Sequence, residues 1–240
     1  MPKRTNHQPQ ENTGVVSLVR AIIHDDAPEV ARLLETSPLL AREGLAVGAS
    51  RQGPTIFSLA EFPHYLYAGD TPLHAAAAGY RIEFARELIR KGADIGARNR
   101  RGAEPLHYAA DGSPASRIWN PQAQVEIIAF LIKKGANPNA LDKSGVAPLH
   151  RAVRQRCSSA VNALLRNGAD VRLKNKSGST PLHLAVQNTG RGGTGSPESK
   201  ALQKEIIEIL LKAGADRQDR DARGKTAKQS AQSEWILALL

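Results

Sequence analysis

The residues that could do chemistry are few, and the histidines are the most regular of them. Four histidines recur at intervals of 33, 43 and 33 residues, at His74, His107, His150 and His183. This spacing places them in successive segments rather than around one ion. The other three histidines are scattered, and the single cysteine leaves no Cys/His cluster of the kind that binds zinc. We therefore expect no metal site.

The cysteine, Cys157, is the one candidate for a reactive thiol. Arg154 and Arg156 lie beside it, and neighbouring positive charge can lower the pKa of a thiol. A lone cysteine in a helix, or at its end, is far more often inert, and we favour that interpretation. No nucleophile stands with a recognisable base. We expect no catalytic residues, and hence no enzyme.

A glycine-rich stretch at residues 190–195 reads G-x-G-x-x-G. This pattern indicates dinucleotide binding only between a strand and a helix of a βαβ unit. Here it follows a predicted helix, and the Gly-Lys-Ser/Thr ending of a phosphate loop is missing. We therefore expect no nucleotide and no other cofactor.

The histidines belong to a longer sequence motif that repeats along the chain. Each one ends a four-residue motif, at 71–74, 104–107, 147–150 and 180–183. A degenerate copy of the motif starts at Thr226. A second phrase, Gly-Ala followed by Asp or Asn, comes later in each segment. A 33-residue period with T-P-L-H-x-A is typical of ankyrin repeats. The chain resembles this family over about residues 15 to 240.

Elementary helix chemistry supports the resemblance. A threonine such as Thr71 or Thr180 can cap a helix with its hydroxyl, and the following proline suits the first helical position. Ala147 lacks the hydroxyl, at a cost of about 1 kcal/mol. The resemblance implies that each motif histidine is structural and forms a hydrogen bond near the start of its helix. It also implies an all-α repeat solenoid of about six helix-turn-helix units joined by β-hairpin loops.

The repeat markers divide the chain into a disordered tail and one repeat domain. We expect the tail at 1–14 and the domain at 15–240. The units are 15–43, 69–101, 102–144, 145–177, 178–223 and 224–240, the first and last being atypical. Three segments exceed the period, at 44–68, 111–124 and 188–200. The sequence leaves open whether they are functional or neutral, although packing of Phe57, Phe62 and Tyr65 is the favoured role of the first.

Charge and composition restrict the class of partner. The formal net charge of +10 favours acidic proteins, nucleic acid or an anionic membrane surface. No apolar run approaches the roughly 18 residues of a membrane-spanning helix, so we expect no membrane insertion. The N-terminal residues do not resemble a secretory signal. One cysteine indicates a reducing compartment, which is most simply the cytoplasm.

Basic residues gather at the predicted hairpin tips and on one predicted inner helix, where the resemblance implies that ankyrin proteins bind their partners. We expect a non-catalytic scaffold that recognises an acidic protein partner. Three alternatives stay open. The same basic residues could bind nucleic acid, the chain could be a regulatory subunit or inhibitor of an enzyme, or the charges could be solvated and serve only solubility. The candidate contact residues are Arg98, Arg100, Arg101, Trp119, Lys143, Arg151, Arg154, Lys174, Lys176 and Arg223.

Overall fold

The computed structural model describes residues 13–49, 65–112, 114, 119–187 and 195–240. Residues 1–12 of the predicted tail, Phe57, Phe62 and most of the glycine-rich motif at 190–195 lie outside the described residues. The first helix begins at Thr13, two residues before the predicted domain start at 15. Gly14 packs so closely on Leu40 that a Cβ there would lie 2.9 Å from its Cδ2.

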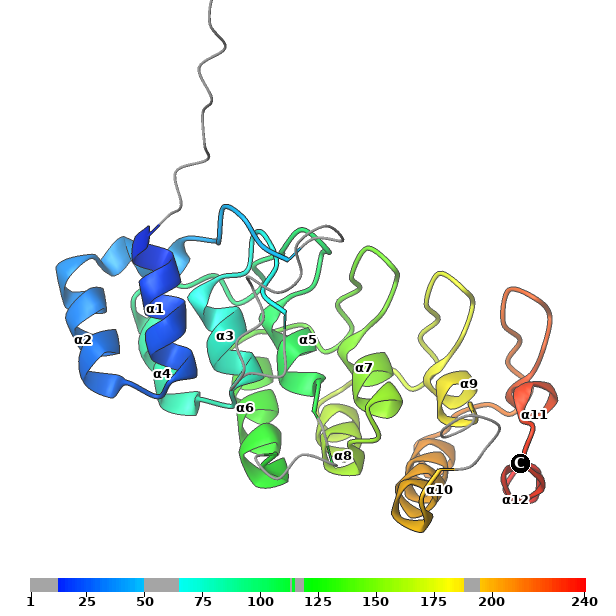
Figure 1. The fold of residues 1–240 in the computed structure, drawn as a ribbon. Coiled ribbons are helices and arrows are strands. Elements are labelled where there is room, and N and C mark those ends of the chain that lie inside the picture. Colours follow the sequence, from blue (N-terminus) through cyan, green and yellow to red (C-terminus); the bar gives the residue numbers. More distant parts are fainter. Residues whose placement is uncertain (1–12, 50–64, 113, 115–118, 188–194) are drawn as a thin grey trace, which may run out of the picture.

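The described residues form six helix pairs stacked in sequence order, as Figure 1 shows. The first helices of the pairs pack on one another along the stack. These elements confirm the predicted all-α repeat solenoid. The pairs are α1 (Thr13–Ile23) with α2 (Ala27–Thr36), α3 (Pro72–Ala78) with α4 (Ile82–Arg90), α5 (Pro105–Ala110) with α6 (Pro121–Lys133), α7 (Pro148–Arg154) with α8 (Ser158–Arg166), α9 (Pro181–Ala185) with α10 (Pro197–Lys212), and α11 (Ala227–Ser230) with α12 (Glu234–Leu237); a 3-10 helix, η1 (Pro38–Arg42), follows α2.

The core is built from small aliphatic side chains, in keeping with the low aromatic content. In α3 the side chains of Ala75, Ala76 and Ala77 are fully buried, which lets neighbouring first helices approach closely. The larger residues Leu131 of α6 and Leu164 of α8 are fully buried as well. No helix in the described part of the chain is long and apolar enough to cross a bilayer.

Each motif histidine joins its own unit to the next one. In the third unit, Nδ1 of His107 accepts a hydrogen bond of 3.1 Å from the backbone N–H of Glu104. Because Nδ1 accepts, the ring proton lies on Nε2, which donates to the carbonyl of Val146 at 3.0 Å. The same pair of bonds recurs at the other three histidines, whose Nε2 atoms reach Ala103, Ser179 and Lys225.

The connecting loops form hairpin tips without a regular strand; within the described residues only an isolated bridge joins Arg220 and Thr226. Each tip begins with Asn or Asp, whose side-chain oxygen accepts the N–H groups two and four residues later; Asn175, for example, accepts from Ser177 at 2.9 Å and Ser179 at 3.0 Å. Gly178 then adopts φ +70°, and a Cβ there would lie 2.4 Å from the nitrogen of Ala222. Glycine is therefore required at this contact between tips.

Successive tips are linked through their backbones. The N–H of Lys143 donates to the carbonyl of Arg101 at 2.9 Å, and the N–H of Lys176 donates to Ser144 at 3.1 Å. Figure 1 shows these loops projecting on one side of the stack. We call the surface formed by the tips and the first helices the inner surface. Its register is fixed by main-chain hydrogen bonds, so side chains at equivalent tip positions follow one another along it.

The turn between the two helices takes two forms. In the ordinary units, 69–101 and 145–177, Tyr80 and Arg156 adopt positive φ values of 56° and 63°. The N–H of the following residue then donates to the end of the first helix, from Arg81 to Ala76 at 2.8 Å and from Cys157 to Ala152 at 3.0 Å. A tight turn thus satisfies a carbonyl at the end of the first helix that has no partner within the helix.

The expanded units, 102–144 and 178–223, carry the inserted segments 111–124 and 188–200 after their first helix. A fully buried glutamine side chain takes the place of the tight turn. Nε2 of Gln124 donates to the carbonyls of Ala109 at 3.0 Å and Asp111 at 3.2 Å. Nε2 of Gln203 donates likewise to Ala185 at 2.6 Å and Gln187 at 2.7 Å.

Candidate partner-binding pocket

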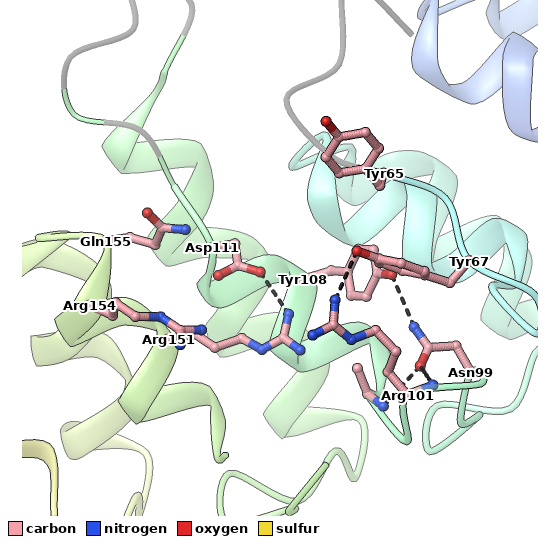
Figure 2. Close-up of a pocket in the computed structure, with 10 residues that line it drawn as sticks. Tyr65, Tyr67, Asn99, Arg101, Tyr108, Asp111, Arg151, Arg154 and Gln155 are labelled. Carbon is pink, nitrogen blue, oxygen red and sulfur yellow. Dashed lines mark hydrogen bonds and ion pairs between the residues drawn. The ribbon is translucent and has the colours of Figure 1, made fainter. Parts of the chain in front are cut away.

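The inner surface contains a pocket of about 200 Å³ between the hairpin tip at 99–103 and the first helices α5 and α7. Figure 2 shows Tyr65, Tyr67 and Tyr108 on one side and Arg154 with Gln155 on the other. The guanidinium groups of Arg101 and Arg151 point toward each other between these sides. The pocket therefore combines residues of three successive units.

A buried carboxylate fixes the aromatic side of the pocket. Asp70 is fully buried and accepts hydrogen bonds from the backbone N–H of Tyr67 at 2.6 Å, Nδ2 of Asn99 at 2.8 Å and Oη of Tyr108 at 2.8 Å. Burial together with the charge of Asp70 raises the pKa of Tyr108, so its hydroxyl stays protonated as a donor. These bonds tie the segment before Gly69 to the next tip and the next helix.

Arg151 occupies the centre of the pocket as part of a buried ion-pair cluster. Its side chain is 13 % exposed and lies 2.8 Å from Asp111 through Nη1 and 3.3 Å from Asp142 through Nη2. Burial alone would lower the pKa of Arg151, but the two carboxylates outweigh this effect and raise it. Its charge is compensated within the chain, so its main contribution is to hold α5, α7 and a hairpin tip together.

Arg101 and Arg154 differ from Arg151 because no carboxylate compensates them among the described residues. Nη1 of Arg101 donates to Oη of Tyr67 at 2.9 Å, and its guanidinium lies 5.0 Å from the centre of the Tyr67 ring. Arg154 is exposed and, in the described part of the chain, has no hydrogen-bond or ion-pair partner for its side chain. The pocket thus presents two cationic donors that are available to an anion.

Four other candidate residues are engaged within the chain. Arg98 pairs with Glu104 at 3.0 Å and donates to the carbonyl of Leu141, while Lys174 donates to the carbonyl of Arg220. Arg100 donates to the carbonyl of Ala49 at 2.7 Å. The partly buried Trp119 donates its indole N–H to Oε1 of Gln124 at 3.0 Å. This bond orients the Gln124 amide, whose Nε2 donates to the carbonyls at the end of α5.

Three candidates at the tips have no such contacts. Lys143, Lys176 and Arg223 are exposed, and their side chains form no hydrogen bond or ion pair with the residues that the structure describes. Lys143 and Lys176 occupy the same position of successive tips and are connected by the backbone links described above. Together with Arg101 and Arg154, they form an uncompensated positive row, which we call the basic row.

The surroundings of Cys157 raise the pKa of its thiol, contrary to the possibility that Arg154 and Arg156 lower it. Cys157 is fully buried at the start of α8. Burial, with a smaller contribution from the charge of Asp111, raises its pKa to about 12. Among the described residues, no group of three or more His, Cys, Asp or Glu side chains could hold a metal ion.

Sequence reasoning missed the polar residues that build the pocket, namely Tyr67, Asn99, Tyr108 and Asp111. One signal was available, because Tyr108 follows the motif histidine at a position where the other units carry Ala75, Arg151 and Leu184. Tyr65 was expected to pack on the first repeat but is 49 % exposed at the edge of the pocket. Tyr65 immediately precedes Leu66, whose carbonyl accepts a hydrogen bond from the backbone N–H of Ala49.

Comparison with known families agrees with the architecture. The model of ankyrin repeats, which spans three copies, matches residues 18–118 and 115–221. A search of curated proteins found no significant match. Ankyrin repeats are generally protein–protein interaction modules and are typically non-catalytic. Because these matches cover most of its length, the chain belongs to the ankyrin-repeat family.

Proposed function

We propose that this chain is a non-catalytic protein-binding module whose inner surface recognises an acidic protein partner. The observation that carries the proposal is the basic row, formed by Arg101, Lys143, Arg154, Lys176 and Arg223. These side chains lie on successive units and have no carboxylate partner among the described residues. Uncompensated charge of one sign on one surface attracts a partner of the opposite sign and speeds association.

The backbone links between tips add to this argument. Because main-chain hydrogen bonds hold each tip on its neighbour, the backbone positions that carry the tip cations keep a fixed spacing before a partner arrives. A preorganised surface loses less conformational freedom on binding than a flexible one. The row is therefore suited to an extended acidic segment or an acidic face of a folded protein.

The proposal is tested with the full chain and a fluorescent peptide of ten glutamates. The variant K143Q/K176Q/R223Q removes three charges from the tips. The control K133Q/R166Q/K212Q removes three exposed charges from the last turns of α6, α8 and α10. We expect the tip variant to bind about fivefold more weakly, while the control stays within about twofold.

Two outcomes would contradict the proposal. Equal losses in both variants would show that only net charge matters and that the inner surface is not selective. Tighter binding of a DNA duplex than of the peptide, with an affinity that falls steeply with salt, would instead favour nucleic acid, because phosphate contacts release counterions.

A further inference from the structure

We infer that the pocket is the receptor for a single side-chain oxyanion of the partner, a carboxylate or a phosphate, gripped between Arg101 and Arg154. This contact sets the position at which the partner lies along the basic row. The inference rests on the proposed function, since the anion is part of the acidic partner. It goes further by distinguishing one anchoring contact in the pocket from the exposed charges of the tips.

The size of the pocket favours one side chain. Its volume of about 200 Å³ is below the range of about 300–1,000 Å³ that is usual for small-molecule and cofactor sites. A carboxylate or phosphate at the end of a side chain fits such a space. The three tyrosines provide apolar surface for the carbon atoms of that side chain.

The two donors come from different units, so only the folded stack brings both of them to the lining of one pocket. Arg101 lies at the tip of the second unit, and Arg154 ends helix α7 of the fourth unit. The hydrogen bond to Oη of Tyr67 uses Nη1 of Arg101 and leaves its other N–H groups for a ligand. The Tyr67 ring beneath the guanidinium restricts its orientation, as stacking on an aromatic face commonly does for arginine.

The acidic residues near the pocket do not cancel these donors. Asp70 is fully buried and accepts three hydrogen bonds. Asp111 and Asp142 are 10 % and 8 % exposed and are covered by Arg151. Arg151 is thus a positioning residue, which neutralises the wall of the pocket and leaves Arg101 and Arg154 to face the ligand. Clusters of arginine are a common means of recognising phosphorylated or acidic motifs.

The first experiment measures binding by NMR, using full-length protein labelled with ¹⁵N and three pentapeptides. Each peptide has four glycines around a central glutamate, phosphoserine or glutamine. We expect the glutamate or phosphoserine peptide to shift the side-chain Nε–Hε signals of Arg101 and Arg154 saturably, and the stronger of the two identifies the oxyanion. Equal shifts with the glutamine peptide, or shifts confined to the tips around Lys143 and Lys176, would overturn the inference.

The second experiment separates the pocket from the open charges with matched variants. R101Q/R154Q and K143Q/K176Q each remove two charges, and R101K/R154K keeps the charges but removes the planar donor groups. Against the ten-glutamate peptide we expect a loss of about tenfold or more for R101Q/R154Q, with most of it persisting in R101K/R154K. For K143Q/K176Q we expect about threefold.

The outcomes distinguish the two proposals. Equal losses in both glutamine pairs, with full binding by R101K/R154K, would overturn the pocket inference and leave the proposed function standing. Failure of the unmodified protein to bind either the ten-glutamate or the phosphoserine peptide would overturn both. Circular dichroism and thermal unfolding of each variant show that a loss of binding is not a loss of fold.

Discussion

The ordinary and expanded units solve the same problem at the end of their first helix with different groups. In the ordinary units, Ala76 and Ala152 receive a backbone N–H from a tight turn. In the expanded units, the equivalent carbonyls of Ala109 and Ala185 receive the side-chain amides of Gln124 and Gln203. A buried carbonyl needs a partner in both cases, because leaving it unpaired costs free energy.

The difference shows how a repeat can carry an insertion without losing its packing. A tight turn fixes the number of residues between the helices. A glutamine on the second helix can instead pair with the last carbonyls of the first helix whatever the length of the chain between them. Long surface loops add little to the entropy of closure. The insertions at 111–124 and 188–200 therefore leave the stacking of α5 on α7 and of α7 on α9 intact.

Ordinary and expanded units alternate along the chain, and each ordinary unit contacts the expanded unit that follows it. Tyr80 and Arg156, the turn residues of the ordinary units, lie 76 positions apart in the sequence, as do Asp111 and Gln187 of the expanded units. Oη of Tyr80 donates to the carbonyl of Asp111 at 2.7 Å, and Nη2 of Arg156 donates to Gln187 at 2.9 Å. Each ordinary unit thus supports the helix end of the expanded unit that follows it.

The most severe test concerns a second coupling, in which Arg151 joins an ordinary unit to the expanded unit before it. Arg151→Met leaves Asp111 and Asp142 as buried, uncompensated carboxylates, and we expect the free energy of unfolding to fall by about 3–5 kcal/mol. Arg154→Met, in the same helix but exposed, should change it by about 0.5 kcal/mol or less. Urea unfolding monitored by circular dichroism measures both. Similar losses in the two variants would refute the coupling.

Acid should weaken a feature that both kinds of unit share, the neutral motif histidine. Burial, helped by the charge of Arg151, lowers the pKa of His107 from 6.5 to about 4. Above pH 6.5 the histidine is neutral in both folded and unfolded chains, and its stabilising effect is complete. As the pH falls from 6.5 toward 4, only the unfolded chain takes up the proton, and we expect a loss of about 3 kcal/mol.

The matched variant is His107→Gln, because Gln229 already fills this role in the last unit, where its Oε1 accepts from the N–H of Thr226 at 2.9 Å. Urea unfolding at pH 7, 6, 5 and 4.5 should show a shallower dependence on pH in the variant than in the unmodified protein. Identical slopes would mean that His107 does not remain neutral in the folded chain.

The glutamine substitution tests the difference between the units directly. Gln124→Ala and Gln203→Ala each leave helix carbonyls unpaired and open a small cavity, and we expect losses of about 2 kcal/mol. Gln122→Ala, at an exposed position in the same helix as Gln124, should cost about 0.5 kcal/mol or less. Thermal unfolding of the three variants gives the comparison. Losses at Gln124 and Gln203 no greater than at Gln122 would show that the insertions need no such closure.

The smallest expected effect concerns the start of an ordinary unit. Ala147 stands where Thr71 and Thr180 occur, and its N–H still donates to Nδ1 of His150 at 3.1 Å. Ala147→Thr restores the capping hydroxyl, and we expect a gain of about 1 kcal/mol in the free energy of unfolding. A loss of stability would show that the packing around this buried position has no room for the larger side chain.

The sequence by itself determined the repeat, the starts of the first helices and the tips, because these depend on groups a few residues apart. Pro181 begins a helix, Thr180 and His183 close its first turn, and Asn175 with Gly178 shapes the tip; all of this chemistry is local. The positions of the insertions followed in the same way, from departures in the spacing of a local motif.

Only the tertiary structure decided which charges are free and where they converge. Arg98, Arg101 and Arg151 are alike in the sequence, yet Arg98 pairs with Glu104, Arg151 with Asp111 and Asp142, and Arg101 stacks on Tyr67. These partners come from other turns and other units, up to 40 residues away. A local pattern specifies a helix, but a pocket between units depends on how the units are stacked, and stacking is a property of the whole array.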